Sequence, residues 1–369
     1  MAASDGEFRI VIPYKPTLSH MSLTKVAIGL YKEFSVQTLR NVFSEMESES
    51  LPVFERGNSE NCPILHNVVK EKLLLIPTNM RKDVLEAVER VQNEVLLWRF
   101  DHSSISGLDD AKFTFFWRSD GTVDRVKTAQ ELVVNQNIDI RNRFDLACMY
   151  CLVNSIQTLW KELKAYGDTE NYETSFNGIE HFWVKWMREG AHVPWTEAAR
   201  QYTEPYWILH PMGSAPRFSS IFRELMPEDR RKYFNYLYFS DADDLRSCLY
   251  IVTKEEQEEI MNLFACRVLR FHMQWPLISL FLETAEKSWK FLNNSSFCGL
   301  LEQLLECNNK SDLDCEHLAI EFWNRSPRHF KEIAKENECL NNKLECIQKK
   351  VTKRKVANDD QASSKRFKK

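Results

Sequence analysis

The chain has 369 residues, a hydrophobic content of 43% that includes 23 Phe and 10 Trp, and a formal net charge of −4. A chain of this length and apolar content can bury a substantial core, which excludes a wholly disordered protein. Residues 348–369 carry nine Lys or Arg against two Asp, a local charge of +7, which leaves −11 for the other 347 residues. So acidic a body argues against binding along nucleic acid, because phosphate contacts need a basic face.

The N-terminal region predicts amphipathic helices. Apolar residues within 22–31 and within 36–46 recur at the i, i+3, i+4 and i+7 spacing of one helix face. Ser35 stands where a residue that caps the second helix is expected. We therefore expect residues 1–101 to form an N-terminal helical region.

Residues 112–123 give the one strand signal. Phe113, Phe115 and Trp117 alternate with other residues before Asp120-Gly121, a dipeptide typical of hairpin turns. The pattern predicts one short β-hairpin near residues 113–123 in an otherwise helical chain.

Residues 133–163 read as a loop followed by two helices, with Leu146-Ala147 in the first and Ile156 and Leu159 in the second. In this layout the segment resembles an ankyrin unit. It departs from that family because it has no TPLH motif and no glycine between the helices, and no 33-residue period appears elsewhere. The resemblance implies a stacked pair of helices over these thirty residues.

Two later helices carry start signals. Thr253 and Glu256 form a capping-box pattern before a helical run that ends near residue 271. Ser326 is expected to cap a second helix whose first position is Pro327. Short polar joints separate such helices, and glycine is scarce. The sequence thus predicts an all-α fold of packed helix pairs or a degenerate helical-repeat stack, with a central helical body over 102–325.

No motif for catalysis or for a cofactor is found. The ten glycines are spread so that no two lie within ten residues, which excludes the P-loop, the dinucleotide fingerprint and the nucleophile elbow. Cys148 and Cys151 form a lone C-x-x-C that we place inside one helix as small buried side chains. Cys298, Cys307, Cys315 and His317 match no zinc-ligand spacing. We expect no enzyme, no metal and no cofactor.

The aromatic-rich stretches between residues 181 and 239 are interpreted as core, because basic residues do not interleave with them as a base-stacking platform requires. The longest uncharged stretch, residues 146–160, contains Asn, Ser, Gln and Thr and is too short for a membrane span. The N-terminus lacks the apolar core of a secretory signal, so we expect the ten cysteines to be thiols in a reducing compartment.

Residues 326–351 are expected to form a C-terminal helix with a heptad pattern. Alternating spacings of three and four residues place its apolar or small polar positions on one seam, which consists of Phe330, Ile333, Asn337, Leu340, Leu344, Ile347 and Val351. Asn337 has the place of a polar residue that fixes register. The seam either packs on the protein's own body or associates with a partner helix, including that of a second copy in a homodimer.

Residues 352–369 form a basic tail with two clusters, which resembles a bipartite nuclear localisation signal. Ten residues separate Lys353-Arg354 from the second cluster, which contains Lys365, Arg366, Lys368 and Lys369. The resemblance implies an importin-type carrier, with each cluster held in a separate acidic site. The alternatives are a solubilising tail and a nucleic-acid-binding arm.

These observations lead to a hypothesis of a nuclear, non-catalytic helical scaffold or interaction protein, with no membrane segment and partners still to be identified. A nucleic-acid-associated protein that uses the basic tail for phosphate contacts is the alternative. An enzyme with an unrecognised helical active site is the third hypothesis. The protein would be cytoplasmic if the tail were not a working import signal.

Overall fold

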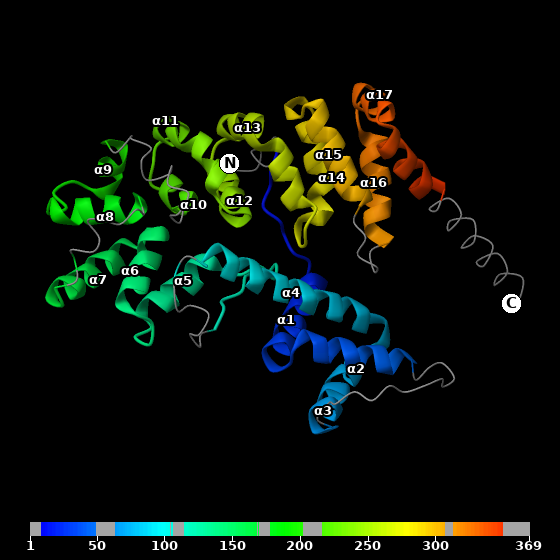
Figure 1. Cartoon of the computed structure of the whole chain (residues 1–369), viewed down its shortest axis with the longest axis horizontal. Coiled ribbons are helices and arrows are strands. Elements are labelled where there is room, and N and C mark those ends of the chain that lie inside the picture. Colours follow the sequence, from blue (N-terminus) through cyan, green and yellow to red (C-terminus); the bar gives the residue numbers. More distant parts are fainter. Residues whose placement is uncertain are drawn as a thin grey trace, which may run out of the picture. The chain divides into compact units, whose positions relative to one another are not determined.

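Within the part of the chain that the computed structural model describes, every regular element is a helix (Figure 1), which confirms the all-α fold. The chain forms two compact units: unit 1 comprises Met1–Pro13 and Ile221–Lys369, and unit 2 comprises Tyr14–Ser220. The four regions expected from the sequence stay predictions. The described residues are 9–48, 63–103, 105, 114–167, 169, 178–201, 216–306 and 313–349.

Unit 2 is built from the helices of the first part of the chain, and α10 continues the chain from unit 2 into unit 1. The bounds are α1 (Leu18–Glu33), α2 (Val36–Ser48), α3 (Pro63–Leu74), the 3-10 turn η2 (Thr78–Met80), α4 (Arg81–Asp101), α5 (Arg125–Val134), α6 (Ile140–Met149), α7 (Val153–Ala165), α8 (Gly178–Arg188), α9 (Trp195–Gln201) and α10 (Phe218–Phe222).

One core of unit 2 lies among α1 to α4, and α1 and α4 run side by side in it (Figure 1). Both helices that apolar spacing predicted here are confirmed as α1 and α2. The Ser35 hydroxyl accepts a hydrogen bond from the Thr38 amide at 3.1 Å, which confirms the expected cap. Leu30, Leu39 and Val42 of the predicted stripes are buried, whereas Val26 is exposed.

Among the described residues 114–123 the expected hairpin is reduced to one antiparallel bridge, between Trp117 and Val123, and Phe113 lies outside them. Gly121 has a φ of 88°, and the Arg118 amide donates to the Thr122 carbonyl at 2.9 Å, so the tight turn at Asp120-Gly121 does form. The chain then enters α5 immediately: Asp124 accepts from the Lys127 amide and acts as the helix N-cap. Because the N-cap follows the bridge directly, the second strand ends after one residue.

The segment that resembled an ankyrin unit is a helix pair, α6 and α7, in contact with each other. The expectation that Cys148 and Cys151 share one helix is wrong. Cys148 is near the end of α6, and Cys151 lies in the turn between the helices with a φ of 54°. The Leu152 amide bonds the Ala147 carbonyl at 2.9 Å, the closing bond of a helix C-cap whose left-handed position usually holds glycine.

The second core of unit 2 lies among α4 to α8 and is rich in tryptophan. Phe182, Val184 and Trp186 of α8 are buried in or beside it, which confirms the interpretation of this aromatic stretch as core. The indole of Trp183 is also buried, and its Nε1 donates to the Cys148 carbonyl at 3.2 Å, so α8 is tied to the end of α6.

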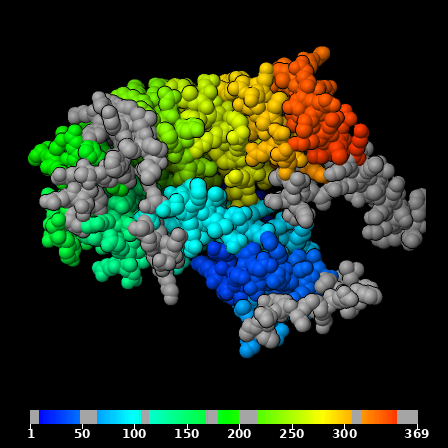
Figure 2. All heavy atoms as spheres, viewed as in Figure 1, coloured from blue at the N-terminus to red at the C-terminus, as the bar shows by residue number. Residues whose placement is uncertain are grey.

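In unit 1, helices that follow one another in the chain pack together from α11 onward. Figure 2 shows the side chains of its last helices (yellow to orange) forming a continuous surface. Its helical residues continue over 338–349. The other bounds are α11 (Pro227–Arg230), η5 (Arg231–Phe239), α12 (Ala242–Ile251), α13 (Lys254–His272), η6 (Leu277–Leu280), α14 (Phe281–Ser288), η7 (Trp289–Phe291), α15 (Asn294–Leu305), α16 (Leu313–Arg325) and α17 (Arg328–Glu336).

The two start signals predicted for unit 1 have different outcomes. The capping box of Thr253 and Glu256 is confirmed at the start of α13, with both reciprocal hydrogen bonds present. Ser326 does not cap α17. Its hydroxyl donates instead to the Trp323 carbonyl of the preceding helix at 2.7 Å, and Pro327 is the N-cap. A serine just after a helix can bond back to that helix, and this bond removes it from the next cap.

Two glycines of unit 2 predict stability changes of opposite sign. Gly167, after α7, has a φ of 73°, and Gly29 lies within α1, and a methyl group at either position would meet nothing within 4 Å. Gly167→Ala should lower the free energy of unfolding by about 1 kcal/mol, because alanine disfavours positive φ. Gly29→Ala should raise it by about 0.5–1 kcal/mol, because alanine favours the helix. Urea denaturation followed by circular dichroism measures both changes, and shifts of the same sign would contradict the account.

Candidate functional site

The basic residues of the expected import signal, Lys353, Arg354, Lys365, Arg366, Lys368 and Lys369, lie outside the described residues, as does Val351 of the seam. The structure places the remaining seam residues in unit 1. Phe330, Leu340, Leu344 and Ile347 are buried in its core, and Ile333 is half-buried. These side chains are therefore covered by helices of the same chain, and pairing with a second copy stays a prediction.

Two contacts explain how the seam fits this core. The ring of Phe330 stacks on that of Phe297 in α15, with the centroids 4.6 Å apart and the planes 7° from parallel. Asn337 interrupts the helix: its backbone is extended, and its Oδ1 accepts from the Leu340 amide at 3.1 Å. Asn337 thus caps residues 338–349, so the expectations of one unbroken helix over 326–351 and of a register role for Asn337 are wrong.

The described residues contain no group of three or more His, Cys, Asp or Glu placed to hold a metal ion. Among the same residues, no helix is both long and apolar enough to cross a bilayer. Cys307 and the side chain of Cys315, which belong to the weak cysteine cluster, lie outside what the structure describes.

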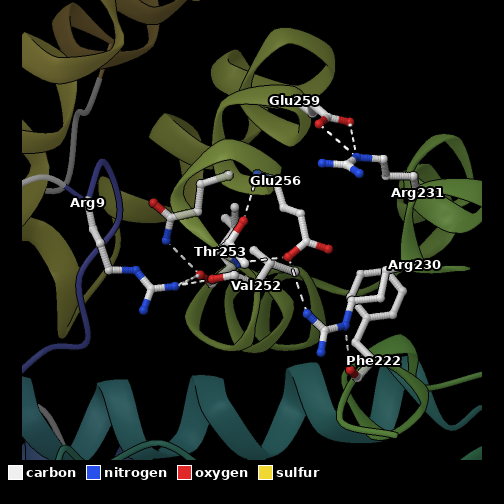
Figure 3. Close-up of polar contacts among 10 residues, drawn as sticks. Arg9, Phe222, Arg230, Arg231, Val252, Thr253, Glu256 and Glu259 are labelled. Carbon is white, nitrogen blue, oxygen red and sulfur yellow. Dashed lines mark hydrogen bonds and ion pairs between the residues drawn. The ribbon is translucent and has the colours of Figure 1, made fainter. Parts of the chain in front are cut away.

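A cluster of polar contacts in unit 1 lies at the corner where α12 ends and α13 begins (Figure 3). The Glu256 carboxylate accepts from the Thr253 amide at 2.7 Å and from Arg230 Nη1 at 3.2 Å. Glu256 is fully buried, and its Oε1 has no hydrogen-bond partner among the residues that the structure describes. A buried carboxylate needs a partner of opposite charge, and Arg230 supplies it.

Arg230 also joins the corner to α10, because its Nε donates to the carbonyl of Phe222 at 2.8 Å. Phe222 is the last residue of α10, where a helix leaves carbonyls without an intrahelical partner. The neighbouring Arg231 forms a different kind of pair, with the exposed Glu259 at 2.9 Å (Figure 3). Arg230 is therefore part of the buried polar cluster, and Arg231 is a surface residue.

The N-terminal segment lies against the same corner. Gln257 is fully buried, and its Oε1 accepts from the amides of Ile10 and Val11 at 3.1 and 3.3 Å. Its Nε2 donates to the carbonyls of Val11 at 3.0 Å and of Leu249 at 2.6 Å. Every hydrogen-bonding atom of this side chain is used, and three of its four bonds go to the backbone of residues 10 and 11.

Arg9 adds a positive charge to the corner between α12 and α13. Its guanidinium donates to the carbonyl of Val252 and lies 3.5 Å from that of Leu249, at the C-terminal end of α12 (Figure 3). A cation is favoured there by the helix dipole and by the carbonyls that the last turn leaves unbonded. We call residues Arg9, Ile10 and Val11 the N-terminal strap.

Unit 2 has a second unusual cluster, the carboxyl pair of Asp145 in α6 and Glu180 in α8. Burial, together with the negative charge of Glu180, raises the pKa of Asp145 to about 8. Burial also raises the pKa of the adjacent Cys148 thiol well above its ordinary value. The pair can therefore hold one shared proton at neutral pH, and Cys148 remains a thiol and not a thiolate.

Sequence reasoning missed most of these residues. The capping box located the start of α13, but nothing along the chain pairs Gln257 with Val11, 246 residues away. Asp145 and Glu180 stand 35 positions apart on two helices, and only their packing makes them neighbours. The charged run of residues 255–259 predicts a solvated helix face, and this prediction is wrong for Glu256 and Gln257, which are buried. The one usable signal was their helical spacing of four residues from the buried Ile260 and Met261.

Comparison with known protein families, curated proteins and solved structures gives no match for this chain.

Asp145→Asn should change stability in a pH-dependent way. The folded Asp145 binds a proton up to about pH 8, whereas the unfolded residue loses it near pH 3.8, so the wild-type contribution to stability falls as pH rises between these values. Asparagine mimics the protonated form. The variant should therefore gain about 1–3 kcal/mol over wild type at pH 8 and close to nothing at pH 4.

Urea denaturation at both pH values measures this difference. Asp124→Asn is the matched control for the loss of one carboxylate charge, because Asp124 is the N-cap of α5 and lies outside the buried pair. An equal difference between Asp145→Asn and wild type at the two pH values would contradict the shared proton.

Arg230→Met should destabilise unit 1 by about 2–4 kcal/mol, because it leaves the Glu256 carboxylate buried without a counter-charge. Arg231→Met removes an exposed pair and should leave the melting temperature nearly unchanged. Adding Glu256→Gln to Arg230→Met should recover part of the loss. Thermal melts followed by circular dichroism measure the stability of each variant. Equal losses from Arg230→Met and Arg231→Met would contradict a stabilising role for the buried Arg230–Glu256 pair.

Proposed function

We propose that this is a non-catalytic nuclear protein whose helical body binds other proteins. The observation that carries the proposal is the outer face of α3. Ile64 and Val68 of α3 and Leu75, the first residue after it, lie along one narrow face and are 75%, 40% and 82% exposed. The opposite face buries Val69 and Leu73 in the core of unit 2, so α3 is apolar on both sides.

Charged residues beside this face support its role as an interface. Lys72 pairs with Glu33 at 3.3 Å, and Glu71 is exposed. An apolar centre with a polar rim is the usual anatomy of a protein–protein interface. A line of three apolar side chains at i, i+4 and i+11 fits one helix laid along it, so the proposed occupant is the apolar face of a partner's amphipathic helix.

The nuclear part of the proposal comes from the basic tail, which separates two Lys and Arg clusters by ten residues. An importin-type carrier is its proposed partner. The acidic charge of the remaining residues favours a protein partner for the body over nucleic acid. Phosphate contacts by the tail are the second candidate, and such binding should weaken steeply as salt rises.

A site-specific crosslink in cells tests both parts. The full chain is made with a photo-crosslinking phenylalanine analogue in place of Val68, or in place of the exposed Gln37 of α2 as the control. We expect Val68 to crosslink an identified nuclear protein and Gln37 not to do so. The purified partner should bind the unmodified chain, and Val68→Ser should weaken that binding at least about tenfold, because an interface centre is sensitive to such a change.

The same experiment with Lys353, Arg354, Lys365 and Arg366 all changed to Ala should keep the protein out of the nucleus and remove the nuclear crosslink. Crosslinks only within the chain, or equal crosslinking from Val68 and Gln37, would overturn the interface. Nuclear accumulation of the four-alanine variant would overturn the import signal.

A further inference from the structure

The corner between α12 and α13 holds the N-terminal strap in the way that a peptide-binding protein holds a peptide. The strap is non-helical, and both amides and one carbonyl of Ile10 and Val11 are bonded by the single side chain of Gln257. This side-chain amide takes the place of a neighbouring β-strand, whose bonds also go to backbone atoms. Recognition of this kind does not depend on the identity of the bound residues.

Side-chain selectivity comes from the two ends of the strap. Arg9 bonds the carbonyls at the C-terminal end of α12, where a basic residue is favoured. Ile10 and Val11 are 5% and 0% exposed, so the two positions after the arginine accept only side chains that bury completely. The chemistry of the site therefore selects an arginine followed by two aliphatic residues in an extended segment.

The corner is held together by contacts in which the strap takes no part. The capping box joins Thr253 to Glu256, Arg230 pairs with Glu256, and Arg230 also bonds the carbonyl of Phe222 (Figure 3). These contacts fix the end of α10 and the start of α13 relative to each other. A corner stabilised in this way can keep its shape when the strap leaves.

The strap is also placed to leave. It precedes six residues, 12–17, that contain Pro13 and Pro16 and form no helix before α1 begins at Leu18. It is thus joined to the rest of the described chain from one side by a short non-helical link. A segment tied in this way competes for its site at an effective concentration on the order of 1 mM.

From these contacts we infer that the α12–α13 corner is a peptide-binding site for an extended Arg-aliphatic-aliphatic segment of a partner protein, which the chain's own N-terminal strap occupies in cis. The strap keeps the site closed until a partner segment of the same chemistry displaces it. The inference does not rest on the face of α3 or on the basic tail.

The test uses the full chain and a fluorescein-labelled peptide of sequence EFRIVIPY, which matches residues 7–14. Wild type should bind it with a Kd weaker than about 1 mM, because the attached strap competes. Arg9→Ala weakens the attached strap but not the peptide, and should tighten peptide binding at least about tenfold in fluorescence anisotropy. Val11→Asp, which puts a charge into the site, should release the strap more completely and tighten binding further.

Two controls separate the site from general stickiness. Lys15→Ala changes an exposed residue outside the strap and should leave peptide binding as in wild type. Gln257→Leu, added to Arg9→Ala, keeps the size of the side chain but removes the four hydrogen bonds, and should abolish binding. Circular dichroism and a cooperative melt establish that each variant is folded.

Failure of the peptide to bind the folded Arg9→Ala and Val11→Asp chains at 1 mM would overturn the proposal. Equal binding to the variant with Gln257→Leu would also overturn it. If both strap variants unfold unit 1, the strap is a fixed part of the fold and not an exchangeable occupant, which again overturns the proposal.

Discussion

A polar group that leaves water must find a partner inside the protein, and in unit 1 this requirement falls on two adjacent residues, Glu256 and Gln257. Both are fully buried at the start of α13. The Oε2 atom of the Glu256 carboxylate accepts from the helix start and from Arg230, and among the described residues the amide of Gln257 bonds only α12 and the N-terminal strap. This requirement makes the beginning of the chain part of a unit whose other residues start at position 221.

Arginine recurs as the residue that closes helix ends in this protein. Arg9 bonds the end of α12, Arg230 the end of α10, and Arg267 the carbonyls of Leu237 and Tyr238 at the end of η5. Short helices leave a large share of their carbonyls unbonded, and a guanidinium offers several donors in one plane. The short elements of unit 1 are thus joined by arginine side chains, whose guanidinium groups bond the terminal carbonyls of a neighbouring element.

The sequence predicted the helices and their start signals better than their connections. Apolar spacing gave α1 and α2, and the capping box gave the start of α13, because both are local properties of the chain. The Cys151 turn and the Asn337 cap escaped prediction, because left-handed backbone at a cysteine and a break inside a heptad pattern are imposed by packing. The contact between Gln257 and the strap could not be predicted from the sequence. The two are far apart along the chain, and the strap contributes backbone atoms, which residues of every type possess.

The central claim is that the strap is held in unit 1 by the buried amide of Gln257, and native-state hydrogen exchange of the full chain tests it most directly. The amides of Ile10 and Val11 both donate to Gln257 Oε1, so they should exchange far more slowly than in an unstructured peptide, with protection that Gln257→Leu removes. Exchange of these two amides at the rate of free peptide in the wild-type chain would contradict the account.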